Sequence, residues 1–204
     1  MNKEENINLF LKEKGFDPEA LVLGEQVHGR KVEIVGKRDG GGTIKRTDGL
    51  ITSSEDIILG VLVADCLPLS FSSKELCGIL HVGWKGLFRG IIEEGMKKVR
   101  NLGINPEVMQ FEVGPGIGVC HFEVKEDLLK KMRKVEGERE MNNFLQKREG
   151  GRIFLDLKEL TKRRIEELGG RNIKISTECT FCEENLFSYR RDREVCNMLA
   201  LQWI

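Results

Sequence analysis

"VLVADCLPLSF", residues 61–71, is an apolar segment that polar residues interrupt in its middle. Residues 61–63 have the apolar, partly β-branched pattern of a buried strand. An acid and a thiol, Asp65 and Cys66, follow at once, and Pro68 comes two residues later. The segment therefore predicts a buried strand that ends in a turn. The polar residues of that turn either stabilise the turn itself or take part in chemistry.

Short apolar segments separated by turn residues continue on both sides of this stretch. Strands are expected at 20–29, 31–35, 48–53, 57–65, 68–73, 76–83, 107–113, 172–177 and 197–204. Apolar residues at helical spacing occur in 4–14, 87–102, 125–148 and 156–168. Since adjacent hairpins are mixed with single helices and there is no regular strand–helix alternation, we predict a single α+β domain over 1–204, with 1–20 as a short N-terminal helical segment.

The composition is that of a globular protein and excludes several classes of function. Thirty-three basic residues balance 33 acidic ones, so the overall charge shows no positive excess of the kind that binds nucleic acid. The first residues mix charges with apolar side chains, unlike a signal peptide, and no window is apolar enough to span a membrane. We therefore expect a cytoplasmic protein that binds neither nucleic acid nor membrane, with its six cysteines reduced. The oligomeric state is left open.

Three potential metal ligands each follow an apolar strand at a turn that contains glycine or proline. They are His28, Cys66 and His81. If the three strands are neighbours in a sheet, their ends bring two imidazoles and one thiolate together. Zinc accepts this set, and three protein ligands leave a fourth position for water, as in catalytic zinc sites. Taken singly, a histidine is more often a hydrogen-bonded residue and a buried cysteine a small apolar one.

Other residues near these turns carry weaker signals, each with a structural alternative. Asp65 either orients a ligand, acts as an acid or base, or caps its turn. The glycines of 114–124 allow backbone N–H groups to approach an anion or a ring, or simply form a tight turn. Arg190 and Arg191 suit phosphate binding, and the alternative is an ion pair with Asp192.

Cys179 and Cys182 form a Cys-x-x-Cys motif late in the chain. No second pair is present to complete a four-cysteine zinc site, and the position does not match a thioredoxin-like motif. We therefore do not expect redox catalysis at this pair.

Six motifs occur in a fixed order along the chain: QVHG (26–29), DGLIT (48–52), ADCLPL (64–69), HVGWKGL (81–87), GPGIG (114–118) and CT…FSYRRD (179–192). Together they resemble the YfiH/laccase-domain family, also called the multicopper polyphenol oxidoreductase family. The resemblance covers roughly 20–204, and six ordered motifs are much more specific than any one of them.

This resemblance implies a single α+β domain of mixed β-sheets flanked by helices. It also implies a metal-dependent purine nucleoside enzyme. It places a zinc ion on His28, Cys66 and His81, the residues that the strand-end argument selects. It implies phosphorolysis of adenosine, inosine, guanosine and methylthioadenosine and deamination of adenosine, with a nucleoside and phosphate as small-molecule partners. Carried over to this chain, the catalytic residues are Asp65, Cys66 and Arg190, and the substrate-binding residues are Gln26, Gly116, Cys120, Ser188 and Arg191.

Three other functions stay open. The older family name implies a laccase-like polyphenol oxidase; copper suits these donors, but a multicopper cluster needs far more imidazoles than three. A cysteine hydrolase would use Cys66 as nucleophile with His81 or His28 as its base, and would need no metal. A non-catalytic or peptidoglycan-editing factor is the third.

Two departures from the family pattern bear on these alternatives. Family members usually carry an N-terminal Arg-Gly-Gly segment that lines the nucleoside pocket, and this sequence does not contain it. His121 stands beside Cys120 where family members often have a second cysteine. It is either a further group near the metal or, as we expect, a hydrogen-bonded loop residue.

Overall fold

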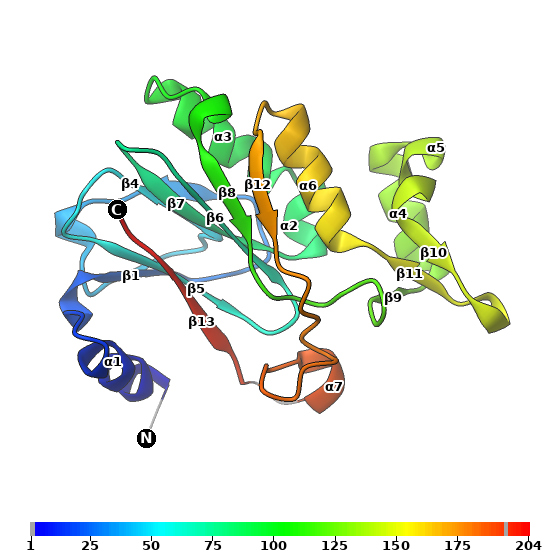
Figure 1. Cartoon of the computed structure of the whole chain (residues 1–204), viewed down its shortest axis with the longest axis horizontal. Coiled ribbons are helices and arrows are strands. Elements are labelled where there is room, and N and C mark those ends of the chain that lie inside the picture. The colour runs from blue at the N-terminus through cyan, green and yellow to red at the C-terminus, as the bar shows by residue number, and fades with distance from the viewer. Residues whose placement is uncertain (1–2, 194–195) are drawn as a thin grey trace.

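Two β-sheets pack face to face, and helices cover the outer face of the larger sheet (Figure 1). The computed structural model describes residues 3–193 and 196–204. The α+β fold that the sequence predicts is confirmed, with mixed parallel and antiparallel pairing in both sheets.

The strands of the described chain fall into three sheets. The six-stranded sheet has the order β12 (Asn172–Ile175), β8 (Gln110–Val113), β6 (Leu67–Ser72), β7 (Cys77–Val82), β4 (Gly49–Thr52) and β2 (Val32–Ile34). The four-stranded sheet has the order β13 (Met198–Gln202), β5 (Ile58–Val63), β1 (Leu21–Gly24) and β3 (Thr43–Ile44). A small third sheet has the order β10 (Leu145–Lys147), β11 (Ile153–Leu155) and β9 (Glu123–Val124).

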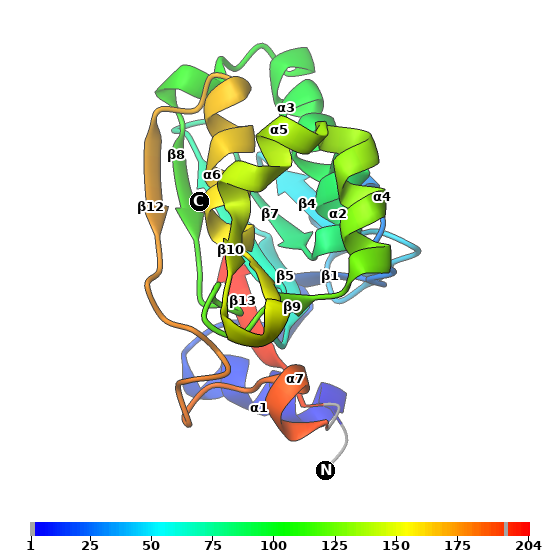
Figure 2. The ribbon, with the colours of Figure 1, turned by 90° about the vertical axis from the view of Figure 1, so that its right-hand side faces the viewer.

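The helices surround these sheets, with α1 and α7 at one end of the molecule and α3 at the other (Figure 2). The α-helices are α1 (Lys3–Glu13), α2 (Trp84–Phe88), α3 (Ile91–Asn101), α4 (Glu126–Glu136), α5 (Glu138–Met141), α6 (Leu157–Glu167) and α7 (Tyr189–Asp192). Short 3₁₀ helices lie at Pro18–Ala20, Lys37–Asp39, Pro106–Val108, Asn142–Phe144 and Glu149–Gly151. None of the helices in the described chain has the length and apolarity that crossing a bilayer requires.

Two of the expected helices are interrupted. The segment 87–102 is divided between α2 and α3, because Gly90 adopts φ +84°, a left-handed conformation that ends one helix before the next begins. The segment 125–148 contains α4 and α5 and then turns into a strand of the third sheet. Apolar spacing alone did not reveal either break.

The alternation of side chains along β7 explains how the two layers are built. Leu80 and Val82 point to the core under the helices, whereas Cys77 and Ile79 point to the core between the sheets. Successive side chains of a strand face opposite sides, so both faces of β7 are buried. The continuous apolar run of β5 has the same cause, because α1 covers its outer face.

Candidate active site

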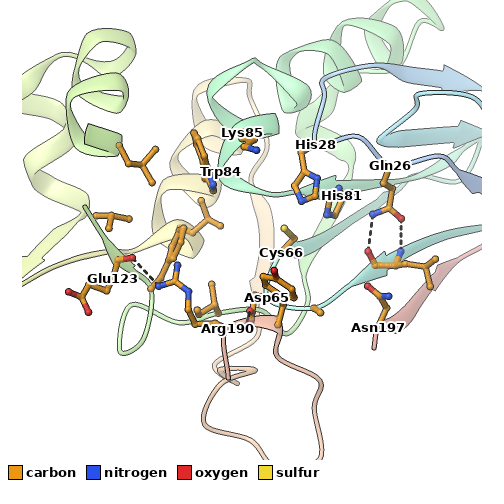
Figure 3. A pocket seen from close by; sticks show the side chains of 18 of the residues that line it. Gln26, His28, Asp65, Cys66, His81, Trp84, Lys85, Glu123, Arg190 and Asn197 are labelled. Atoms are coloured by element: carbon orange, nitrogen blue, oxygen red, sulfur yellow. Dashed lines mark hydrogen bonds between the residues drawn. The ribbon is translucent and has the colours of Figure 1, made fainter. Parts of the chain in front are cut away.

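The turn between β5 and β6 crosses from the smaller sheet to the larger one and leaves Cys66 beside two histidines (Figure 3). His28 comes from the loop after β1, and His81 lies in β7. The ligand atoms of the three side chains all lie within 4.8 Å of one another, and the two imidazole rings meet edge to face. The structure thus brings the predicted trio together, close enough to hold one metal ion.

These residues meet by a different route from the one expected. β1 and β5 are parallel neighbours, but β7 belongs to the other sheet. His81 is inside β7 rather than after it, and by alternation it faces the smaller sheet, as Cys77 and Ile79 do. The group is therefore assembled between two sheets and not at three neighbouring strand ends.

Asp48, which the sequence pattern did not single out, fixes both histidines. Its buried carboxylate accepts three consecutive backbone N–H groups, those of residues 27–29, at 2.8 to 3.1 Å. It also lies 3.0 Å from His81 Nδ1. Because a carboxylate only accepts hydrogen bonds, Nδ1 carries the proton and Nε2 is left for a metal. The same bonds hold His28 at φ +55°, which non-glycine residues rarely adopt.

The trio is electrostatically coupled. Burial alone raises the pKa of a thiol, but hydrogen bonds from His28 and His81 and the charge of the imidazoles bring the pKa of Cys66 down to about 7. Burial lowers the pKa of an imidazole, yet hydrogen bonds to Asp48 and Cys66 raise the pKa of His81 to about 9. Near neutral pH a much larger fraction of Cys66 is therefore thiolate than for an ordinary cysteine, and the thiolate is the form that binds metals and attacks electrophiles.

The trio lies at the wall of a cavity of about 1090 Å³. Aromatic side chains and basic side chains both line this cavity, among them Trp84, Phe122 and Tyr189, and Lys85, Lys131 and Arg190. In Figure 3, Trp84 and Lys85 extend from the start of α2 on one side and Arg190 reaches in from the segment around α7. The cavity is large enough for a ligand of nucleoside size.

Asp65 is tied into the structure by both of its oxygens. Oδ1 accepts the hydroxyl of Thr180 at 2.7 Å, and Oδ2 accepts the backbone N–H of Arg190, also at 2.7 Å. Its own backbone has φ +84°, a strained value for a residue with a side chain. Asp65 therefore joins the turn that carries Cys66 to the segment that carries Arg190.

The two adjacent arginines have different surroundings. Arg190 lines the cavity; its Nη1 donates to the carbonyl of Glu123, and its guanidinium lies 5.5 Å from the ring of Phe122. The guanidinium of Arg191 instead donates to four backbone carbonyls and to Asp192. Of these two arginines, only Arg190 lines the cavity.

Three other residues expected to bind substrate make mainly structural contacts. Ser188 is buried and caps α7 by accepting the N–H of Arg191, away from the cavity. The amide of Gln26 reaches the cavity wall, but its oxygen and nitrogen both bond the backbone of Leu62 at 2.8 Å. Gly116 packs under the Asp65 turn, where a side chain would overlap the core.

Cys120, also expected at the substrate site, is not among the cavity residues and lies in a second group of side chains that could hold a metal ion. His121, Cys179 and Cys182 complete this group. The sequence contains no second Cys-x-x-Cys pair, but one cysteine and one histidine from a distant loop lie beside this pair. Nδ1 of His121 lies 3.3 Å from Cys182 Sγ, within hydrogen-bond distance, and His121 belongs to this group rather than to the trio at the cavity.

Sequence reasoning missed Trp84, Lys85 and Tyr189 as cavity residues, although all three lie within quoted motifs. A motif gives the order of residues but not the direction in which each side chain points.

The fold and this site define an α+β protein with a candidate single-metal centre at a cavity. The profile of the family described as "Multi-copper polyphenol oxidoreductase laccase" matches residues 2–204. A Campylobacter jejuni protein named as a purine nucleoside phosphorylase is 33% identical over 208 residues, 99% of this chain and 85% of the relative. The Escherichia coli protein named purine nucleoside phosphorylase YfiH is 31% identical over 191 residues, 92% of this chain and 75% of the relative.

Solved structures agree with the profile. YfiH of Bacillus licheniformis superposes with a TM-score of 0.89 at 29% identity, covering 97% of this chain and 79% of that one. YlmD of Geobacillus stearothermophilus also has a TM-score of 0.89, at 30% identity and 97% and 78% coverage. The chain belongs to the YfiH/laccase-domain family, as its motifs predict.

The donor set fits one metal ion rather than a multicopper cluster. The whole chain has three histidines, and only two of them are at the cavity. A blue-copper site together with a trinuclear cluster requires many more imidazoles. Two imidazoles and one thiolate suit a single zinc ion with one position open.

Proposed function

We propose that this chain is a zinc-dependent purine nucleoside phosphorylase that also deaminates adenosine. Adenosine, inosine, guanosine and methylthioadenosine are the proposed substrates of phosphorolysis. The observation that carries the proposal is the cavity, in which a three-donor metal group faces aromatic rings and an available guanidinium. The printed names of the relatives support the same class of reaction.

Arg190 is the proposed phosphate-binding residue. Its planar fork offers five N–H donors, and the carbonyl of Glu123 takes only one hydrogen bond from Nη1. The remaining donors match the bidentate geometry that phosphate prefers. Lys85, on the opposite side of the cavity, adds a second positive charge (Figure 3).

Aromatic side chains of the cavity are proposed to hold the purine. Trp84 extends from the start of α2 into the cavity, and Tyr189 lies at its rim with about half of its surface exposed. Flat rings of this kind stack on a purine in offset or edge-to-face geometry.

His28, Cys66 and His81 are the proposed zinc ligands, with Asp48 holding the tautomer of His81. When bound, zinc supplies Lewis acidity to water or to a phosphate oxygen, and three protein ligands leave it one open position. Asp65 is assigned a positioning role, because both of its oxygens already accept hydrogen bonds. An open position suits deamination as well as phosphorolysis.

A cysteine hydrolase is the second candidate. The observation in its favour is the pKa of Cys66, which hydrogen bonds from two imidazoles lower to about 7 despite burial. A thiolate beside histidine is the arrangement of a cysteine nucleophile and its base. This mechanism works without metal, whereas the first proposal requires it.

The test is an assay of purified protein with adenosine, with and without phosphate, before and after removal of metal by a chelator. We expect adenine only when phosphate is present, inosine without phosphate, inosine together with hypoxanthine when phosphate is added, and loss of all these products without metal. Cys66→Ala should abolish both activities. Cys77→Ala is the matched control, since burial raises the pKa of that core thiol to about 11 and keeps it protonated.

Undiminished turnover by metal-free protein would overturn the zinc mechanism and support the hydrolase. Bound zinc with no turnover of any nucleoside would support a non-catalytic or peptidoglycan-editing role. Oxidation of a phenol by the copper-loaded protein would support the older laccase-like name.

A further inference from the structure

Four metal-binding side chains gather on the far side of the Asp65 turn, where the glycine-rich loop meets the Cys-x-x-Cys segment. They are Cys120, His121, Cys179 and Cys182, and their ligand atoms all lie within 4.8 Å of one another. None of the four is among the residues that line the cavity. We propose that these residues bind a second zinc ion, which has a structural role.

The distances between the donors match a tetrahedral zinc site. Zinc–sulfur bonds of about 2.3 Å and zinc–nitrogen bonds of about 2.0 to 2.1 Å place tetrahedral ligands about 3.8 Å apart for two sulfurs and about 3.5 Å apart for sulfur and nitrogen. Cys120 Sγ and Cys182 Sγ are 3.7 Å apart. Nδ1 of His121 lies 3.3 Å from Cys182 Sγ and 4.0 Å from Cys179 Sγ.

The backbone around the group prepares these positions. The N–H groups of residues 182 and 183 both donate to the carbonyl of Cys179, which forms a tight turn and brings the two sulfurs of the motif to one side. The N–H of Gly118 donates to Cys179 Sγ at 3.1 Å, a bond that stabilises a thiolate. The ring of His121 stacks on Phe181 with centroids 4.0 Å apart, which fixes its orientation.

The number of ligands separates this group from the one at the cavity. Three protein donors leave a zinc ion open to water or substrate, whereas three thiolates and one imidazole close its coordination. A closed site stabilises the fold and takes no part in chemistry. Two groups of different composition within one small protein therefore indicate two different uses of the same metal.

A zinc ion at this position would tie the glycine-rich loop, which contributes Ile117 and Phe122 to the cavity wall, to the Cys-x-x-Cys segment. The glycine-rich loop packs against the turn of Asp65 through Gly116, and Gly116 pairs with the segment of Cys179 in a β-bridge. Between the two motif cysteines, Thr180 donates its hydroxyl to Asp65. The ion would thus fix the segment that carries Thr180, the hydrogen-bond donor to Asp65. It would thereby stabilise the turn that carries Cys66.

The alternative use of these thiols is a disulfide. The Sγ atoms of Cys120 and Cys182 are well beyond the bond length of about 2.05 Å. A disulfide would also involve only two of the four side chains and would leave His121 and the third thiol unbonded. Zinc uses all four groups at once.

Zinc content and X-ray absorption at the zinc edge test the proposal on the unmodified protein, purified under reducing conditions. With both sites occupied we expect two zinc ions per chain and an average of two sulfur ligands per zinc, because Cys66 supplies one sulfur and the second group supplies three. One zinc with three sulfurs would support the second site and remove the first. One zinc with one sulfur would overturn the second site.

Cys182→Ser gives an independent test. It should lower the zinc content from two ions to one and the average sulfur count from two to one, while the exposed Cys196→Ser, which lies outside both groups, should leave both values unchanged. If Cys182→Ser does not fold, the absorption measurement on the unmodified protein still shows whether three sulfurs and one histidine bind a second zinc ion. Wild-type protein whose mass is lower by two hydrogens and which holds no zinc at the second group would establish a disulfide and overturn the proposal.

Discussion

Replacing Asp48 by asparagine is the most direct test of how the site is organised. Oδ1 receives the N–H of His28 at 2.8 Å and Nδ1 of His81 at 3.0 Å, and Oδ2 receives the N–H groups of Val27 and Gly29 at 3.1 and 2.8 Å. Asparagine has only one oxygen, so either orientation of its amide leaves two N–H groups of this part-buried network facing an NH₂ group. Each unsatisfied donor costs about 1 to 3 kcal/mol, and we expect a loss of about 2 to 6 kcal/mol in the free energy of unfolding.

Urea unfolding of chelator-treated protein, followed by tryptophan fluorescence, measures this loss without any contribution from metal. Asp56→Asn is the control, because Asp56 forms only an exposed ion pair with Lys37, which contributes less than about 1 kcal/mol. Loss of the carboxylate that bonds Nδ1 of His81 should also weaken zinc binding at the cavity about 10- to 100-fold. If Asp48→Asn unfolds within about 1 kcal/mol of the wild type and binds zinc equally well, the organising role of Asp48 is refuted.

Three further predictions concern the cavity and its surroundings. Arg190→Ala should raise the KM for phosphate at least about tenfold with little loss of stability. Arg191→Ala should instead lower the free energy of unfolding by about 1 to 3 kcal/mol. Equal KM values in the two variants would contradict the assignment of phosphate binding to Arg190 alone. In the metal-free state Cys66 has a pKa of about 7 and His81 of about 9, and zinc must displace their protons. Zinc affinity should therefore fall about tenfold per pH unit from pH 9 to 7 and more steeply below 7, measured by competition with a chelator against a Cys66→Ala blank. Gly116→Ala should lower the free energy of unfolding by about 1 to 3 kcal/mol, because its Cβ would overlap a core leucine; an unchanged urea midpoint would contradict the packing.

The trio of the cavity could be anticipated because each member is a ligand-type residue next to an apolar strand. That pattern is local, and strand patterns are the part of a fold that sequence expresses most directly. The pattern did not specify which sheet each strand joins. His81 is an example. The face of β7 on which it lies follows from alternation with Cys77 and Ile79, but the residues it faces depend on how the two sheets stack.

The second group could not be anticipated in the same way. His121 and Cys182 are separated by 61 positions, and no periodicity relates one loop to the other. Their encounter depends on the parallel pairing of β12 with β8, which carries the two following loops to the same edge of the sheet. Asp48 was missed for a related reason, because a buried acid directly before an apolar strand looks like a turn residue until its four donors are seen.

The conformation of Asp65 connects these observations. A residue with a side chain at φ +84° is unfavourable by about 1 to 3 kcal/mol, and it persists only where the surroundings hold it. Here two short hydrogen bonds do so, from Thr180 and from the backbone of Arg190. The strain has a use, since the turn must cross between two sheets within three residues and still direct the thiol of Cys66 towards both imidazoles. A glycine at 65 would relieve the strain but lose both bonds, so the crossing needs an acid at this position even if no proton ever moves through it.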